Sequence, residues 1–350
     1  MLLTLLACAE GGPAPTTETA EPYEGLVLNA NLLGLGEVDL RIEDGVVVEL
    51  GELVGEGVDL RGKTVVPAFV DSHVHLAYWE VADELAAGGV AAAVDLAAPV
   101  GSITAGLPLE VLWSGPMVTA TEGYPTQSWG RNGYGLEVSG EVEARQAVRD
   151  LHASGARVIK VPMQSPRLPD EVLRAVADEA HGLGLLVATH ALTDEQAAVA
   201  AQVGFDVLAH TPTEALSDDT VKAWSNKAVV STLAAFGGSS TTVDNLRRLD
   251  QAGATVLYGT DLGNTRTPAI DPWELSLMGA AGLDGEAILA AATSAPAELW
   301  GLDDLGTVEV GKEASFLVLS GDPRQDPSLL GEPEAVWIKG LQMESITSAR

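Results

Sequence analysis

The sequence predicts an α/β fold in which a (β/α)8 barrel of the TIM type is flanked by β-strands from both chain ends. From residue 65 onward, short apolar runs rich in β-branched residues alternate with Ala- and Glu-rich helical stretches. Eight such runs can be counted, and strands that alternate with helices imply parallel strands joined by right-handed crossovers. The runs are continuously apolar, which is typical of strands buried on both faces.

The expected barrel strands follow one another along the chain at residues 65–70, 90–96, 117–120, 157–161, 185–189, 207–209, 228–233 and 255–258. Several helical stretches between them open with an acidic residue, which favours a helix N-terminus. The expected helices include residues 141–153, 170–183, 194–203, 218–225 and 243–252, and a last helical region covers 272–302.

Both ends of the chain have a β pattern. Short strand-like runs separated by Gly and acidic turns fill residues 26–66, and the same rhythm returns at 306–319 and 335–340. These segments could pair into one module. The predicted organisation is therefore a β module from residues 23–64 and 304–345, and a barrel from 65–303.

Composition narrows the possible functions. The chain has 350 residues, a net charge of −31 and a hydrophobic content of 46%, so it is globular and strongly acidic. Such a charge repels nucleic acid, and we exclude nucleic-acid binding. Cys8 is the single cysteine, so no internal disulfide can form.

The N-terminus has a feature of its own. Leu5-Leu6-Ala7-Cys8 resembles the lipobox of bacterial lipoprotein signal peptides, and a Gly-, Pro- and Thr-rich stretch follows it. The resemblance implies that residues 1–22 are a signal and flexible tether, with a lipidated Cys8 and a location in the bacterial cell envelope. The apolar run is short and lacks a basic start, so either the true start lies upstream or this is a chance hydrophobic N-terminus of a cytoplasmic protein.

Polar residues stand at the ends of the expected barrel strands. His73 and His75 follow the first strand two residues apart, so they leave it on the same side. The others are Lys160 within the fourth strand, His190 and His210 after the fifth and sixth, and Asp261 after the eighth. In a barrel these strand ends meet at one mouth, where the catalytic residues gather.

These side chains suit a metal centre. Four imidazoles and a carboxylate are ligands for Zn²⁺ or a similar divalent ion. Lys160 can contribute only if CO₂ carbamylates it, since an ammonium cannot bind a cation. A bound ion makes water a hydroxide nucleophile at neutral pH, and Asp261 is the carboxylate that can take the proton.

The motif at residues 67–75, Pro-Ala-Phe-Val-Asp-Ser-His-Val-His, resembles the first-strand signature of the amidohydrolase superfamily. The segment 306–319, followed by Gly321-Asp322-Pro323, resembles the imidazolonepropionase-like and prolidase-like members. The resemblance implies a small β-sandwich made by both chain ends. It also implies two divalent ions, one held by His73, His75 and Asp261, the other by His190 and His210, with carbamylated Lys160 bridging them.

Residues 122–138 form a long aromatic and polar loop after the third strand. Tyr124, Arg131 and Tyr134 in this loop are candidate contacts for a small-molecule substrate, and Arg131 could bind a substrate carboxylate. The alternative is a surface loop packed on its own aromatic rings. Family members usually have a long excursion after the two histidines, whereas only residues 76–89 stand here, so the site is more open or other loops close it.

The predicted function is hydrolysis of a carbon–nitrogen bond in an amide, cyclic amide or peptide-like substrate, by metal-bound hydroxide with Asp261 as general base. The same centre could instead act on a lactone or phosphoester, or deaminate a heterocycle. A different class also remains open, a lipid-tethered protein that binds a ligand without catalysis. A homo-oligomer is compatible with all of these.

Overall fold

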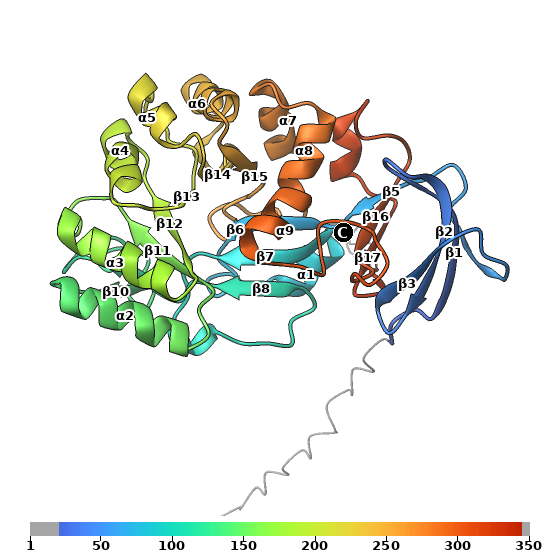
Figure 1. Cartoon of the computed structure of the whole chain (residues 1–350), viewed down its shortest axis with the longest axis horizontal. Coiled ribbons are helices and arrows are strands. Elements are labelled where there is room, and N and C mark those ends of the chain that lie inside the picture. The colour runs from blue at the N-terminus through green and yellow to red at the C-terminus, as the bar shows by residue number, and fades with distance from the viewer. Residues whose placement is uncertain (1–20, 345–350) are drawn as a thin grey trace, which may run out of the picture.

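The computed structural model describes residues 21–344, so the predicted lipidation at Cys8 lies outside the described residues. Figure 1 shows a large body of strands and helices beside a β-rich body, to which the blue N-terminal and red C-terminal strands both contribute. Within residues 21–344, no helix has the length and apolar character needed to cross a membrane.

Eight short parallel strands form the TIM-type barrel that the sequence predicts. In chain order these strands are β6 (Phe69–Val74), β7 (Val90–Asp95), β8 (Glu110–Trp113), β11 (Val158–Pro162), β12 (Leu186–His190), β13 (Val207–Leu208), β14 (Ala228–Val230) and β15 (Thr255–Leu257). Ser72 N donates to Tyr258 O at 2.9 Å and joins the first strand to the last. Arg157 N donates to Trp113 O at 2.9 Å and joins β8 to β11.

The prediction for the first barrel strand, residues 65–70, is wrong in its boundaries. β5 (Thr64–Pro67) pairs with β1 and β16 in the terminal sheet, and only β6 belongs to the barrel. The chain changes sheets at Ala68, whose N donates to Ser315 O, while Phe69 N donates to Gly89 O. The apolar run is long enough to serve two sheets, and its hydropathy does not mark the break.

The third strand also differs. A strand does form at the predicted residues 117–120, since β9 (Met117–Thr119) contacts β11 and pairs with β10 (Gly135–Glu137). The pairing with β7, however, is made by β8, which the sequence did not predict. β8 has four residues and begins with the exposed Glu110. A run this short and partly charged does not stand out in a search for apolar segments.

The helices lie outside the strands and cover them (Figure 1). In order they are α1 (Ala82–Ala87), α2 (Glu141–Ala153), α3 (Asp170–Gly182), α4 (Asp194–Gln202), α5 (Asp218–Ala223), α6 (Ser240–Gln251), α7 (Pro272–Ala280), α8 (Gly285–Ala292) and α9 (Ser294–Trp300). Several have side-chain N-caps, and Thr193 and Ser239 each accept a hydrogen bond from the first helical turn.

Both chain ends supply strands to one sheet, ordered β18-β17-β16-β5-β1-β2-β3, with β4 paired to β1. Its members besides β5 are β1 (Gly25–Leu32), β2 (Gly36–Glu43), β3 (Val46–Gly51), β4 (Gly57–Asp59), β16 (Phe316–Leu319), β17 (Ala335–Ile338) and β18 (Leu341–Gln342). Phe316 and Trp337 stack at 5.3 Å in its apolar core. The two-layered sandwich and the domain boundaries stay predictions.

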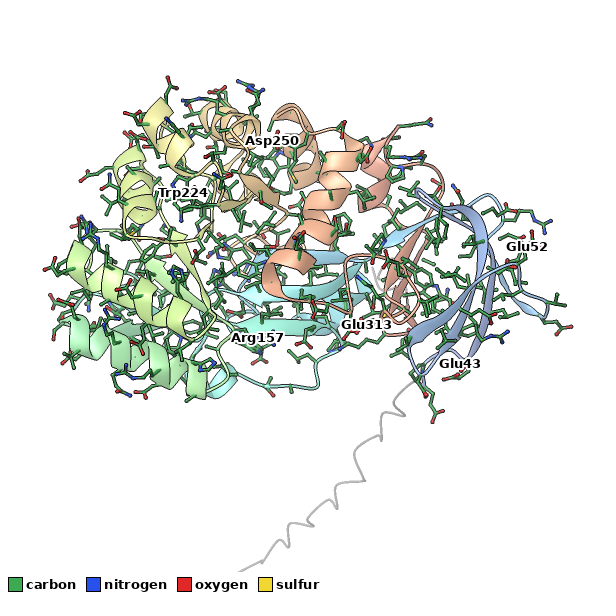
Figure 2. All side chains as sticks on the ribbon, viewed as in Figure 1. Glu43, Glu52, Arg157, Trp224, Asp250 and Glu313 are labelled. Atoms are coloured by element: carbon green, nitrogen blue, oxygen red, sulfur yellow. The ribbon has the colours of Figure 1, made fainter. Side chains whose placement is uncertain are left out.

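Acidic side chains are exposed on the surface of the terminal sheet. Glu43 and Glu52 project into solvent from the terminal sheet, as Figure 2 shows. Trp224, by contrast, is fully buried, and its Nε1 donates to Ala197 O at 3.0 Å. The fold therefore packs an ordinary apolar core beneath a strongly charged exterior.

Candidate active site

The structure brings all six predicted metal-site residues together at the carboxyl ends of the barrel strands. They line one cavity of about 210 Å³. Its lining consists of His73, His75, Lys160, His190, His210 and Asp261, together with Met117, Tyr124, Ala235, Phe236 and Asn264. All six predicted residues are buried.

His73, His75 and Asp261 meet because the first and last barrel strands are bonded beyond their ends. Asp261 N donates to His73 O at 2.8 Å, and His75 N donates to Leu262 O at 2.7 Å. His75 Nε2 lies 3.1 Å from Asp261 Oδ1, and His73 Nε2 lies 3.6 Å from it. Ligand atoms of the three residues all lie within 4.8 Å of one another, close enough to share one ion.

The Asp71 carboxylate links the two segments that meet at this junction. No role for Asp71 was predicted from the sequence. Its carboxylate accepts hydrogen bonds from Thr260 Oγ1 at 2.5 Å, Thr260 N at 3.1 Å and His73 N at 3.1 Å. Burial raises the pKa of Asp71 to about 7. The available signal was an aspartate directly after an apolar run and two residues before His73, because a buried carboxylate needs nearby donors.

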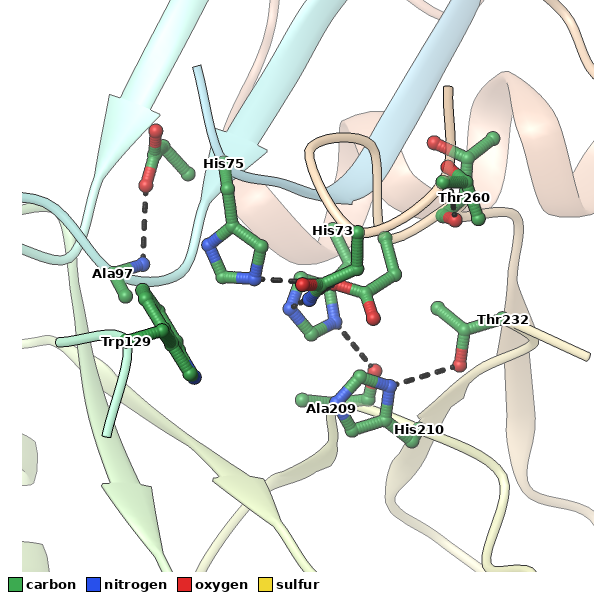
Figure 3. Close-up of polar contacts among 12 residues, drawn as sticks. His73, His75, Ala97, Trp129, Ala209, His210, Thr232 and Thr260 are labelled. Atoms are coloured by element: carbon green, nitrogen blue, oxygen red, sulfur yellow. Dashed lines mark hydrogen bonds and ion pairs between the residues drawn. The ribbon is translucent and has the colours of Figure 1, made fainter. Parts of the chain in front are cut away.

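Hydrogen bonds fix two of the imidazole rings (Figure 3). His73 Nδ1 lies 2.7 Å from Ala209 O, so it carries the proton and leaves the Nε2 lone pair free. His210 Nδ1 lies 3.1 Å from Thr232 Oγ1. Metal-binding histidines in proteins are oriented in this way through their second nitrogen.

Burial and the neighbouring charges shift the buried groups towards neutral amine and imidazole and towards an ionised Asp261 carboxylate. Burial lowers the pKa of Lys160 to about 7, and burial followed by the Lys160 charge lowers the pKa of His190 to about 3. Burial acts to raise the pKa of the Asp261 carboxyl, but His73 and His75 lower it to about 2.

Three of these buried atoms, His73 Nε2, His190 Nε2 and Lys160 Nζ, have no hydrogen-bond partner within the described part of the chain. Buried polar atoms are normally satisfied, so these atoms fit a metal site in which each contributes to holding an ion.

Comparison with known proteins agrees with this geometry. A family model described as the amidohydrolase family matches residues 64–343. The chain belongs to the amidohydrolase family. An imidazolonepropionase from Deinococcus radiodurans is 29% identical over 346 residues, covering 81% of this chain and 85% of that protein.

Solved structures of low identity share the fold. A Xaa-Pro dipeptidase with bound methionine has a TM-score of 0.78 at 20% identity, covering 91% of this chain and 99% of that one. Molinate hydrolase has a TM-score of 0.75 at 18% identity, covering 93% and 96%. The family prediction is confirmed, and these relatives include the imidazolonepropionase and prolidase types that the sequence resembles.

The loop at residues 122–138 covers the site of this amidohydrolase. Tyr124 stacks on His190 with ring centroids 5.2 Å apart and accepts a hydrogen bond from Trp129 Nε1 at 2.8 Å. The Trp129 ring lies 5.5 Å from that of His75 (Figure 3). The short segment after His75 therefore does not leave the site uncovered, because the loop after the third strand closes over it.

The three candidate substrate contacts in this loop have different surroundings. Tyr124 lines the cavity. Tyr134 donates its hydroxyl to Ala77 O at 2.9 Å and ties the loop to the segment after His75. Arg131 is exposed, and one of its guanidinium nitrogens donates to Gln127 O at 3.2 Å. The structure thus brings Tyr124 to the metal-site residues, and it places Tyr134 and Arg131 outside the cavity lining.

Two further residues near the candidate metal-site residues had no role in the sequence-based prediction. Asn264 lines the cavity and donates from Nδ2 to Asp261 Oδ1 at 3.0 Å. Asp95, at the end of β7, accepts from Ala77 N and Ala97 N, each at 3.0 Å, and holds the turn that follows His75. A lone Asn in a loop has no distinctive signal, but Asp95 closes an apolar strand as His190 and His210 do.

Glu274 on α7 provides a pH test of the fold. Burial raises the pKa of this carboxyl to about 7, above its unfolded value near 4.5. The folded protein therefore binds more protons, and the free energy of unfolding falls as pH rises between these values, by about 3 kcal/mol. In denaturant titrations from pH 4 to 8, we expect Glu274→Gln to show a shallower decline than wild type. Equal slopes would refute the shifted pKa.

Proposed function

We propose that this amidohydrolase is a metal-dependent enzyme that hydrolyses a carbon–nitrogen bond in an amide, cyclic amide or peptide-like small molecule. The observation that carries the proposal is the convergence of four histidines, Lys160 and Asp261 on one buried cavity with unpartnered nitrogen atoms. A protein that only holds a ligand has no need of such a set.

His73, His75 and Asp261 would hold one divalent ion, His190 and His210 a second, and Lys160 would bridge them as a carbamate. Zn²⁺ is the proposed metal because imidazole and carboxylate ligands suit it. Such ions supply a Lewis acid for the substrate carbonyl and a water acidified towards neutrality. His73 is ready for this role, since its Nδ1 is engaged by Ala209 O and its Nε2 is free.

The proposed carbamate on Lys160 follows from its burial. With a pKa near 7, a substantial fraction of the amine is unprotonated at neutral pH. The neutral Nζ can attack CO₂, forming an N–C bond while one C=O π pair moves onto oxygen. The nitrogen then loses one proton to solvent, and the neutral amine has become an anionic carbamate. This reaction replaces a poorly placed cation with a ligand that can contact two ions.

Asp261 is the proposed general base and acid. Among the described residues that line the cavity it is the one carboxylate, and Asn264 orients it through a hydrogen bond to Oδ1. It would take a proton from the attacking water and deliver it to the leaving nitrogen, which needs that proton to depart as an amine.

The remaining cavity wall indicates a compact substrate group. Met117, Tyr124 and Phe236 present apolar or aromatic surface beside the metal-site residues. The cavity, about 210 Å³, is smaller than the ~300–1,000 Å³ usual for drug-sized ligands. Substrates in which a small, largely apolar group adjoins the scissile bond are therefore expected to fit.

The test is a substrate screen with Zn²⁺ added. Cyclic amides and dipeptides come first, because one relative is an imidazolonepropionase and one structural neighbour is a Xaa-Pro dipeptidase. N-acyl amino acids and lactones complete the panel. Turnover of amides supports the proposal. Turnover confined to lactones, phosphoesters or amino heterocycles would show that the same site catalyses one of the alternative reactions instead.

Metal analysis separates the enzyme from the ligand-binding alternative. About two divalent ions per folded chain are expected for the proposed centre. A folded protein that retains no metal after incubation with Zn²⁺ and bicarbonate would favour a non-catalytic binding protein.

The covering loop leads to a paired prediction. We expect Tyr124→Ala to raise KM by about 10-fold or more, because it removes aromatic surface worth about 1.5–3 kcal/mol from the cavity wall. Arg131→Ala should change KM less than about twofold, because Arg131 is exposed and bonded within its own loop. Steady-state kinetics on the substrate found in the screen measure both. A large effect of Arg131→Ala would restore it as a substrate contact.

We also propose that Cys8 is lipidated and tethers the enzyme to a bacterial membrane, on the basis of the lipobox-like sequence before it. Intact mass of protein from the membrane fraction should then correspond to a chain that begins at Cys8 and carries acyl groups. A soluble chain that keeps Met1 would refute the tether.

A further inference from the structure

We propose that Glu274, which lies in α7 outside the cavity lining, is a positioning residue for His210 and for the ion that His210 would bind. The inference rests on the proposed metal centre. It assigns to a buried carboxylate the task of holding both structures that confine the His210 ring, namely the Thr232 hydroxyl and the Phe236 side chain.

The first step is the contact between Glu274 and the segment after β14. The Glu274 side chain is fully buried. Its Oε1 accepts a hydrogen bond from Leu233 N at 2.9 Å, and its Oε2 accepts one from Ala234 N at 2.7 Å. The Ser231 hydroxyl is a further partner of the same carboxylate. One side chain thus binds residues on both sides of Thr232.

The second step is the conformation of Thr232. Its φ is +39°, in the left-handed region that a β-branched residue rarely adopts. Such a conformation is strained and persists only where surrounding contacts hold it. Glu274 supplies those contacts on either side, and Thr232 N donates to Gly259 O at 3.2 Å. The consequence is that Thr232 Oγ1 lies 3.1 Å from His210 Nδ1 (Figure 3).

The third step concerns the other face of His210. Leu233 and Ala234 lead into a short 3-10 turn, Ala234–Phe236, whose Phe236 ring meets His210 edge-on at 4.9 Å. The turn also packs closely on α7, since a Cβ at Gly238 would lie 2.8 Å from Leu277 Cδ1. Glu274 therefore anchors both the hydroxyl that orients the imidazole and the ring that confines it.

A glutamine cannot replace this carboxylate. It offers one acceptor oxygen to two backbone N–H groups, and its amide nitrogen would face the second N–H. We expect Glu274→Gln to release Thr232. The affinity for the ion at His190 and His210 should then fall by about 10- to 100-fold, as it does at other metal sites when a residue that hydrogen-bonds to a ligand is lost. The ion at His73, His75 and Asp261 should keep its affinity within about threefold, because Asp71 and Asn264 support that part of the site.

The test is a two-site Zn²⁺ titration of metal-free protein against a chromophoric chelator, with bicarbonate present. Glu286→Gln is the matched control, since it makes the same change on an exposed residue of α8. Weakening of one of the two binding events in Glu274→Gln, with the control unchanged, supports the inference. Wild-type affinities in a folded Glu274→Gln protein, or equal weakening of both events, would overturn it.

A double-mutant cycle with Thr232→Ala separates positioning from general destabilisation. If Glu274 acts through Thr232, the second substitution should add little to the first. The affinity of the double variant for the ion at His190 and His210 should then lie within about threefold of that of either single variant. Fully multiplied losses would show that Glu274 does not act through Thr232. Should Glu274→Gln fail to fold, Ser231→Ala carries the same test, with a smaller loss at the same ion expected and wild-type binding overturning the inference. Failure of wild-type protein to bind metal would instead count against the proposed function.

Discussion

We expect Asp261→Asn to lower kcat by about 10²–10⁴-fold while the proposed ions stay bound, because an amide can still offer an oxygen ligand but cannot accept the proton of an attacking water. The expected loss is large because the leaving nitrogen also depends on that proton. His75 Nε2 and Asn264 Nδ2 both lie within about hydrogen-bond distance of Asp261 Oδ1, so the Asn side chain has neighbours that can hold it in place.

Kinetics and metal analysis on the same preparation decide this prediction. Asp284→Asn is the matched control, because Asp284 caps α8 at an exposed position and Asn caps equally well. The control should retain wild-type kcat. If Asp261→Asn turned over at a wild-type rate with its metal bound, Asp261 would not be the base. If the variant lost its metal, the loss of activity would be explained by the role of Asp261 as a metal ligand.

Lys160→Met should lower metal content and activity but raise the stability of the metal-free protein. The variant cannot form a carbamate, so we expect loss of about one ion per chain and a fall in kcat of at least about 100-fold. In metal-free protein, however, the same change should stabilise the fold at neutral pH. Lys160 is fully buried, and its pKa falls from 10.5 to about 7, so burial of the protonated amine is costly.

The free energy of unfolding of the metal-free protein should depend on pH because of Lys160. Between about pH 7 and 10.5 the unfolded chain holds a proton on Lys160 that the folded chain has lost, so wild-type stability rises with pH by on the order of 5 kcal/mol. Lys160→Met should lack this rise and should melt at a higher temperature than wild type at pH 7.

Thermal melts after chelation measure the effect of Lys160→Met. Lys222→Met, at an exposed position of α5, should keep the wild-type pH profile and activity. A ¹³C resonance from a carbamate after incubation of wild-type protein with ¹³CO₂ should be absent in Lys160→Met. Full metal content and activity in that variant would rule out the bridging role.

Much of the candidate site was predictable because its signals are local. A histidine, lysine or aspartate at the end of an apolar strand is visible in a short window, and parallel strands of a barrel point their carboxyl ends to one mouth. His73, His75 and Asp261 are far apart in sequence, yet each could be placed at a strand end without knowing its neighbours. The order of strands then brings them together.

The boundaries were less predictable because hydrogen-bond partners decide them. Residues 65–70 form one apolar run in the sequence, but Ala68 N donates to Ser315 O and Phe69 N donates to Gly89 O, so the run divides between two sheets. The strand Glu110–Trp113 is likewise defined by its pairing with β7 rather than by its composition.

The barrel and the six residues at its mouth could be predicted from the sequence, because residue type and periodicity along the chain indicate them, and the family could be predicted from the resemblance of the motif at residues 67–75. Only the folded structure shows that Tyr124 packs on His190 and Trp129 on His75, whereas Arg131 is exposed and bonds within its own loop. It also decided that Glu274 reaches Leu233 and Ala234 from a helix some 40 residues further along. The physical reason is that loop packing and buried carboxylates depend on donors and surfaces that are distant in sequence and leave no periodic pattern.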